Sequence, residues 1–106
     1  MKLIIAIVQD EDSSRVLTSL MQKEFGVTKL ATTGGFLKAG NTTLLIGVDD
    51  QRLDEAIGVI ESVCKSRKQI TTARSSATGV SSPFPLEVTI GGATLFVLSV
   101  EQFLKV

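Results

Sequence analysis

Apolar residues in the first third of the chain form a continuous run and then a helical stripe. Residues 3–8 are uninterruptedly apolar and rich in β-branched side chains, which is typical of a strand buried on both faces. The polar segment Asp10–Ser13 suits the start of a helix, and Gly26 suits its end. We therefore predict a strand followed by a helix, whose buried face consists of Val16, Leu17, Leu20, Met21 and Phe25.

The next third repeats this order with one more strand. Residues 28–33 and 42–48 both have strand composition, and the second run is apolar enough to be buried. Asp49 and Asp50 then precede a second helical stripe. The apolar positions of that stripe are Leu53, Ala56, Ile57, Ile60 and Cys64.

The last third is mostly polar until residue 86. Residues 69–72 predict a short strand, and 73–85 show no period, which predicts a long polar loop. Apolar and polar residues alternate over 86–90, as in a half-exposed strand. Gly91-Gly92 predicts a tight turn into a final strand over 93–100.

This order of elements predicts an α+β fold of the ferredoxin-like type, βαββαβ, with an additional terminal hairpin strand. The chain has 106 residues, which predicts a single domain over 1–106. Helices cover only one face of such a sheet, so a second subunit is the simplest cover for the other face.

The charge balance and the hydropathy of the chain indicate which kinds of partner to expect. Eleven basic residues balance eleven acidic ones, so neither a nucleic-acid polymer nor an anionic membrane is expected as the main partner. Hydrophobic residues make up 43% of the chain, and the mean hydropathy is +0.32, which favours self-association.

The chain lacks the residues of common active sites. It has no His and one Cys, Cys64, so a Ser-His-Asp triad, a Cys-His pair and the usual zinc sites are excluded. Asp10, Glu11 and Asp12 suggest either a metal cluster or helix capping with dipole complementarity, and we favour the second interpretation. We therefore expect no enzyme, no catalytic residue, no metal site and no cofactor.

Location follows from two further features. A lone cysteine forms no intrachain disulfide, which suits a reducing cytosol. The apolar run at the N-terminus is too short for a signal-peptide core or for a membrane span. We expect a cytoplasmic protein.

Residues 28–43 carry the richest candidate chemistry. Several threonines and Asn41 offer neutral hydrogen bonds, Gly34-Gly35 permits close backbone approach, and Phe36 offers a flat apolar face. With Lys38 as a cation, these residues suit a planar, phosphate-bearing small molecule. An ordinary solvated hairpin is the alternative interpretation of the same residues.

Three segments of the sequence resemble the PII-like cyclic-di-AMP receptor family: 1–10, 28–41 and 91–94. The run Lys29-Leu30-Ala31-Thr32-Thr33-Gly34-Gly35-Phe36-Leu37 is close to a signature of that family. The resemblance implies a bacterial signal-transduction protein with a ferredoxin-like core that forms homotrimers. It also implies that cyclic-di-AMP binds in clefts between subunits and that loop rearrangement transmits binding to a protein target, which is unknown.

The resemblance assigns ligand contacts residue by residue. It implies a hydroxyl donor, a loop segment that contacts the nucleotide, a side chain that recognises a base edge, and a close-approach position on the strand after the loop. The hydroxyl donor is Thr28, and the loop segment is Gly35, Phe36 and Leu37. The side chain that recognises a base edge is Asn41, and the close-approach position is Gly47.

Three positions depart from the family pattern. Glu24 and Gly26 occupy positions where the family tends to carry Asn and Arg, and Lys38 stands where Arg is common. Arg would face a phosphate with charge-assisted hydrogen bonds, which Gly26 does not supply. The alternative function is therefore a PII-like trimeric scaffold with lost or altered nucleotide specificity, acting through protein contacts.

Overall fold

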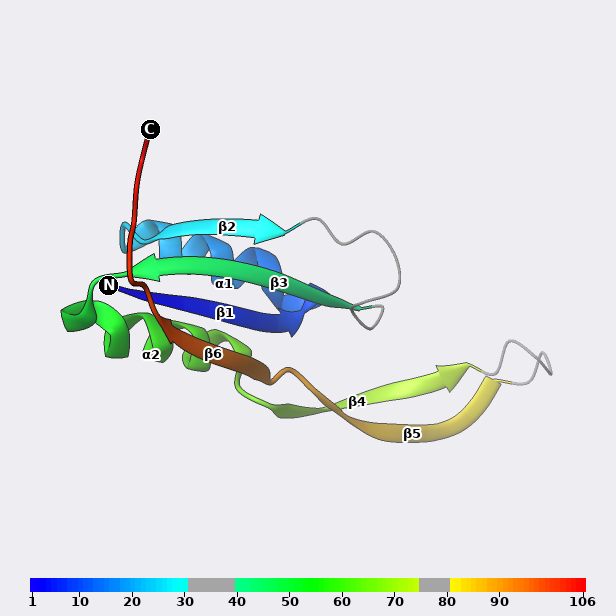
Figure 1. Cartoon of the computed structure of the whole chain (residues 1–106). Helices are drawn as coiled ribbons and strands as arrows, with labels where there is room; N and C mark the ends of the chain where they lie inside the picture. The colour runs from blue at the N-terminus through cyan, green and yellow to red at the C-terminus, as the bar shows by residue number, and fades with distance from the viewer. Residues whose placement is uncertain (31–39, 75–80) are drawn as a thin grey trace.

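The structure is a computed structural model. It describes the backbone of residues 1–30, 40–74 and 81–106, and the side chains of residues 1–30, 40–69 and 87–106. Along the chain, one strand is followed by a helix, two strands, a second helix and three further strands (Figure 1). Their bounds are β1 Lys2–Gln9, α1 Asp10–Gln22, β2 Gly26–Leu30, β3 Asn41–Val48, a 3-10 turn η1 Asp50–Arg52, α2 Leu53–Cys64, β4 Arg67–Arg74, β5 Ser81–Ile90 and β6 Ala93–Ser99.

Within the described residues, the main sheet has four antiparallel strands in the order β2-β3-β1-β6. Helices α1 and α2 lie side by side on one face of this sheet (Figure 1). With β6 as its last strand, the core follows the βαββαβ order. The predicted α+β, ferredoxin-like class is therefore confirmed.

The core lies between this sheet and the two helices. Ile4, Ala6 and Val8 of β1 are fully or almost fully buried against the helices, while Ile5 and Ile7 between them are only half-buried. The prediction that both faces of this strand are buried is thus wrong for the single chain. The buried apolar residues are Ile4, Ala6, Val8, Val16, Leu20, Phe25, Leu44, Ile46, Val48, Ala56, Val59, Ile60 and Cys64.

The end of α1 differs from the prediction. The helix ends at Gln22, and Glu24 adopts a positive φ of 64°. The Glu24 N–H donates to Met21 O at 2.9 Å, and the Phe25 N–H donates to Leu20 O at 3.0 Å, which is a Schellman motif. Gly26 therefore begins β2 rather than ending the helix, and Met21, predicted on the buried face, is 60% exposed.

Strands β4 and β5 form a separate two-stranded ribbon between α2 and β6. Figure 1 shows this ribbon extending away from the main sheet. The Cα radius of gyration is 17.2 Å, whereas a compact domain of this length has about 13 Å. The predicted loop 73–85 thus contributes to two strands, and Gly91-Gly92 links the ribbon to β6 instead of turning a hairpin.

Candidate functional site

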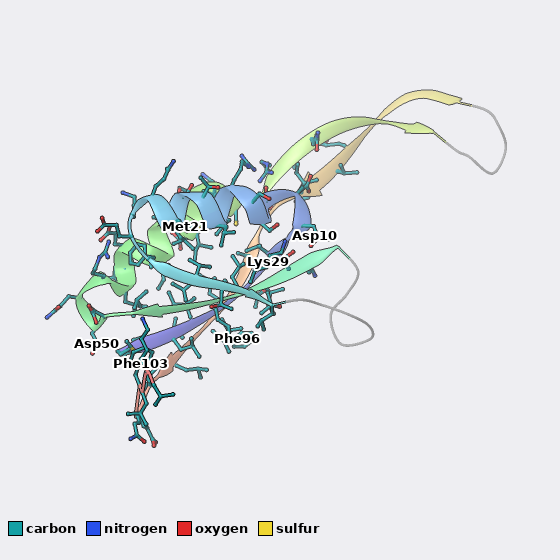
Figure 2. The ribbon with its side chains drawn as sticks, turned by 90° about the horizontal axis from the view of Figure 1, so that it is seen from above. Asp10, Met21, Lys29, Asp50, Phe96 and Phe103 are labelled. Atoms are coloured by element: carbon teal, nitrogen blue, oxygen red, sulfur yellow. The ribbon has the colours of Figure 1, made fainter. Side chains whose placement is uncertain are left out.

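The face of the main sheet opposite the helices carries the candidate site. Directly paired residues of antiparallel strands point to the same face, so the register identifies its members. Phe96 lies on this side, away from the helices (Figure 2). The face, called the open face below, consists of Gly26, Thr28 and Leu30 of β2, Asn41, Thr43, Leu45 and Gly47 of β3, Leu3, Ile5, Ile7 and Gln9 of β1, and Thr94, Phe96 and Leu98 of β6.

Thr28 and Gly47 lie close together on the open face. Gly47 pairs with Gly26, and Thr28 follows Gly26 by two residues on the same face. All three residues are exposed. A Cβ added at either glycine would meet no atom within 4 Å. A flat ligand can therefore approach the backbone here, beside a hydroxyl group.

Asn41 lies at the other end of β3. Asn41 is half-buried and pairs with Gln9 of β1. Together with Ile7 and the segment 91–94, these two amides line a hollow of about 250 Å³. Gly47 lies six positions after Asn41 in β3, which is about 20 Å along an extended strand.

The predicted ligand residues that the structure describes thus form two groups on one face. Gly35, Phe36 and Leu37 lie outside the described residues. Because the two groups are far apart, the described part of one chain does not enclose a small ligand between them.

Sequence reasoning missed Gln9 as a polar residue of the open face, and it did not distinguish Thr43 from the other threonines of residues 28–43. Gln9 accepts a hydrogen bond from the Gly91 N–H through its Oε1, at 2.8 Å. Thr43 is 6% exposed, and its Oγ1 has no hydrogen-bond partner among the described atoms. A buried hydroxyl without a partner is costly, so it favours the arrival of a ligand or subunit on this face. The only sequence signals were the position of Gln9 before an acidic segment and the pair Thr42-Thr43.

Asp10, Glu11 and Asp12 lie in the first turn of α1, where their charge complements the helix dipole as predicted, but none of them is the N-cap residue. Gln9 is the N-cap residue of α1, and it forms no side-chain cap hydrogen bond. The Asp10 N–H donates to Gly40 O at 2.8 Å, and Asp10 Oδ1 accepts from Thr42 Oγ1 at 2.5 Å. Asp10 thereby fixes the chain just before and inside β3.

Asp12 is fully buried and neutralised by two guanidinium groups. Its Oδ1 accepts from Arg67 Nη2 at 2.8 Å and from Arg15 Nη2 at 2.7 Å. The hydrogen bond from Arg67 lowers the pKa of Asp12 below its usual range, against burial, which raises it. An ionised, arginine-paired carboxylate explains this residue without a metal ion.

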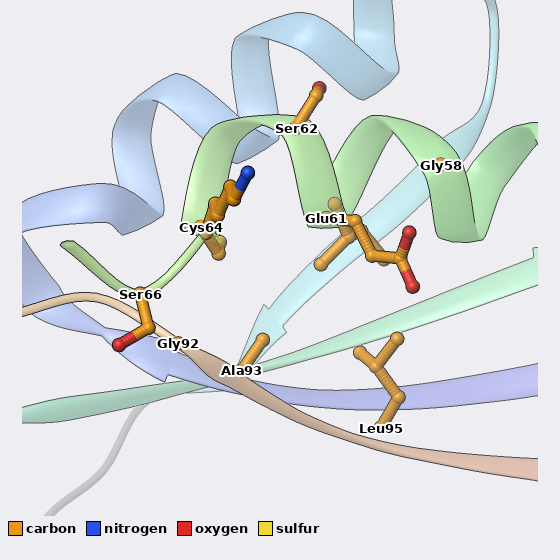
Figure 3. A pocket seen from close by; sticks show the side chains of 10 residues that line it. Gly58, Glu61, Ser62, Cys64, Ser66, Gly92, Ala93 and Leu95 are labelled. Atoms are coloured by element: carbon orange, nitrogen blue, oxygen red, sulfur yellow. The ribbon is translucent and has the colours of Figure 1, made fainter.

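A larger hollow, of about 590 Å³, lies between α2 and β6 (Figure 3). It contains none of the predicted ligand residues. Cys64 lies on its wall, and burial raises the pKa of this thiol to about 11. The thiol is therefore protonated at neutral pH and unsuited to nucleophilic attack.

Among the described residues, no helix combines the length and apolar character needed to cross a membrane.

Comparison with known proteins places this geometry in a family. Residues 1–106 match a protein family described as "Cyclic-di-AMP receptor". The solved structure of a functionally unknown protein from Pediococcus pentosaceus ATCC 25745 is 38% identical, with a TM-score of 0.79. The match covers 99% of this chain and 96% of that chain. The chain belongs to the cyclic-di-AMP receptor family.

Proposed function

We propose that this protein binds cyclic-di-AMP on the open face and passes the signal to a protein target in the bacterial cytoplasm, without catalysis. The observation that carries the proposal is the family match over the whole chain. The position of Thr28, Asn41 and Gly47 on one sheet face agrees with it. A receptor family is a binding and signalling family, which supports a role without catalysis.

The residue types suit the parts of the ligand. The Asn41 amide offers both a donor and an acceptor to an adenine edge. Gly47 leaves the strand backbone open to a flat base, and Thr28 offers a hydroxyl group beside it. By resemblance, Gly35, Phe36 and Leu37 add backbone and apolar contacts to the nucleotide.

We further propose that the protein is a homotrimer whose subunits together form each binding cleft. Phe96 and Leu98 of the open face are about half exposed, at 52% and 47%. Asn41 and Gly47 lie too far apart for one chain to enclose a small ligand between them, so we expect a second copy of the chain to close the cleft. Sedimentation equilibrium should give three times 11.3 kDa, and a monomer at micromolar concentration would contradict both assembly and cleft.

A trimeric scaffold with altered nucleotide specificity is the second candidate function. One observation favours it: none of the described strand residues on the open face is charged, and Gly26 stands where the family tends to carry Arg. Such a face offers no side-chain cation to a phosphate.

Calorimetric titration with cyclic-di-AMP, cyclic-di-GMP and ATP separates the two functions. The receptor function predicts saturable binding of cyclic-di-AMP and much weaker binding of the other two. Asn41→Ala should weaken the binding of cyclic-di-AMP about tenfold, because a base edge loses its partner. A folded trimer that binds none of the three nucleotides would favour the scaffold.

A further inference from the structure

The base of the β4–β5 ribbon is held by an ion pair whose carboxylate is fully buried and whose guanidinium group is partly exposed. Arg67 is the first residue of β4, and Asp12 lies in the first turn of α1. Arg67 Nη2 lies 2.8 Å from Asp12 Oδ1, and Arg67 Nη1 lies 3.4 Å from Asp12 Oδ2. Because the guanidinium spans both oxygens of a fully buried carboxylate, it fixes direction as well as distance.

A second contact holds the other strand of the ribbon. Gly91 follows β5 directly, and its N–H donates to Gln9 Oε1 at 2.8 Å. Gly91 has a φ of 84°, and an added Cβ would lie 2.7 Å from Arg67 Nη1 and 2.9 Å from Lys65 O. The backbone of Gly91 therefore packs directly against the ion pair, and no larger residue fits there.

Both contacts are made by residues of one short segment, Gln9–Asp12, which also borders the candidate site. Gln9 lines the hollow with Asn41. Asp10 holds the Gly40 carbonyl and the Thr42 hydroxyl on either side of Asn41. The position of Asn41 and the base of the ribbon thus depend on neighbouring residues of one strand-to-helix junction.

We propose that Gln9, Asp12, Arg67 and Gly91 form a clamp that positions the 91–94 wall of the hollow and couples ligand binding at Asn41 to the ribbon. The proposal rests on the proposed function and names its regulation. Arg67 is a positioning residue, because it does not line the hollow. Coupling of this kind is reciprocal: what loosens the ribbon base weakens binding, and binding tightens the ribbon base.

Arg67→Gln tests the clamp, and Arg15→Gln is its matched control. Arg15 donates to the same Asp12 oxygen but stays within α1 and is exposed. Arg67→Gln should weaken cyclic-di-AMP binding about tenfold in calorimetry and speed amide hydrogen exchange of Gly91 at least fivefold. Arg15→Gln should change either quantity less than twofold.

Two further readouts separate positioning from plain destabilisation. Arg67→Lys, which keeps the charge but not the fork geometry, should restore the affinity only in part. In the wild type, cyclic-di-AMP should slow exchange at the backbone amides of Arg67–Gln69. If Arg67→Gln does not fold, Asp12→Asn takes its place with the same expectations.

Several outcomes would overturn the clamp. One is a folded Arg67→Gln variant that binds cyclic-di-AMP as tightly as the wild type does. Another is a wild-type protein that binds cyclic-di-AMP with no change in amide hydrogen exchange at Arg67–Gln69. If the wild type does not bind cyclic-di-AMP, the proposed function fails, and the clamp is judged on the free protein. Thr42→Val, which removes the Asp10 contact, should then speed Gly91 exchange at least threefold, and unchanged exchange would refute the coupling.

Discussion

Replacing Gly26 with arginine tests whether this chain lacks one phosphate contact. Gly26 is exposed on the open face, opposite Gly47 and two residues before Thr28. Its φ is not in the left-handed region, and an added Cβ would meet no atom within 4 Å. The substitution therefore adds an arginine beside the candidate ligand residues at a position with room for its Cβ.

The expected gain follows from two opposing contributions. A hydrogen bond to a charged group contributes about 1.5–3 kcal/mol. Ordering an arginine side chain costs up to about 2 kcal/mol. We expect Gly26→Arg to tighten cyclic-di-AMP binding by about 1 kcal/mol, which is about fivefold in Kd.

Calorimetric titration at low and high salt measures this gain. The tighter binding should shrink at high salt, because ions screen the added charge. Gly58→Arg is the matched control: Gly58 is exposed on α2, and a Cβ there also meets no atom within 4 Å. If Gly26→Arg binds more weakly than the wild type, or no better than Gly58→Arg, the phosphate is held by other groups.

Three further predictions concern stability. Glu24→Gly should raise the free energy of unfolding by about 1 kcal/mol in chemical denaturation, because Glu24 adopts a positive φ; unchanged stability would contradict the strain. Thr43→Val should raise the thermal midpoint of the free protein, because the buried Oγ1 has no described partner, and should weaken ligand binding; a lower midpoint would mean that the hydroxyl is satisfied. The lowered pKa of Asp12 means that its ion pair stabilises the fold above the usual aspartate pKa of about 4 and is lost as the pH falls below that value; Asp12→Asn should flatten the acid side of the stability curve, and an unchanged slope would contradict this.

The strand and helix stripes could be predicted because the main core imposes them. Ile4 and Leu44 are buried, as the apolar runs 3–8 and 42–48 predicted. The sequence does not distinguish Ile4 from Ile5, however, because both are apolar and only the helices decide which face is covered. Leu3, Ile5 and Ile7 on the open face are apolar although they are only half-buried, which is why the run 3–8 resembled a strand buried on both faces.

The ribbon and the clamp could not be predicted from local patterns. Strands β4 and β5 pair with each other outside the main sheet, and the sequence of residues 73–85 shows no period that predicts a strand. Arg67 and Asp12 are 55 residues apart, and only the fold brings them together. The candidate site was predictable as residue types in a motif, whereas the contribution of Gln9 depends on its pairing with Asn41.

Mapping amide chemical shifts of the deuterated wild-type protein during titration with cyclic-di-AMP tests the central claim most directly. If the ligand binds on the open face, the largest shifts should occur at Thr28, Asn41 and Gly47, and Gly58 on α2 should shift little. The largest shifts at Gly58 and Ser62, which line the hollow between α2 and β6, would contradict the account.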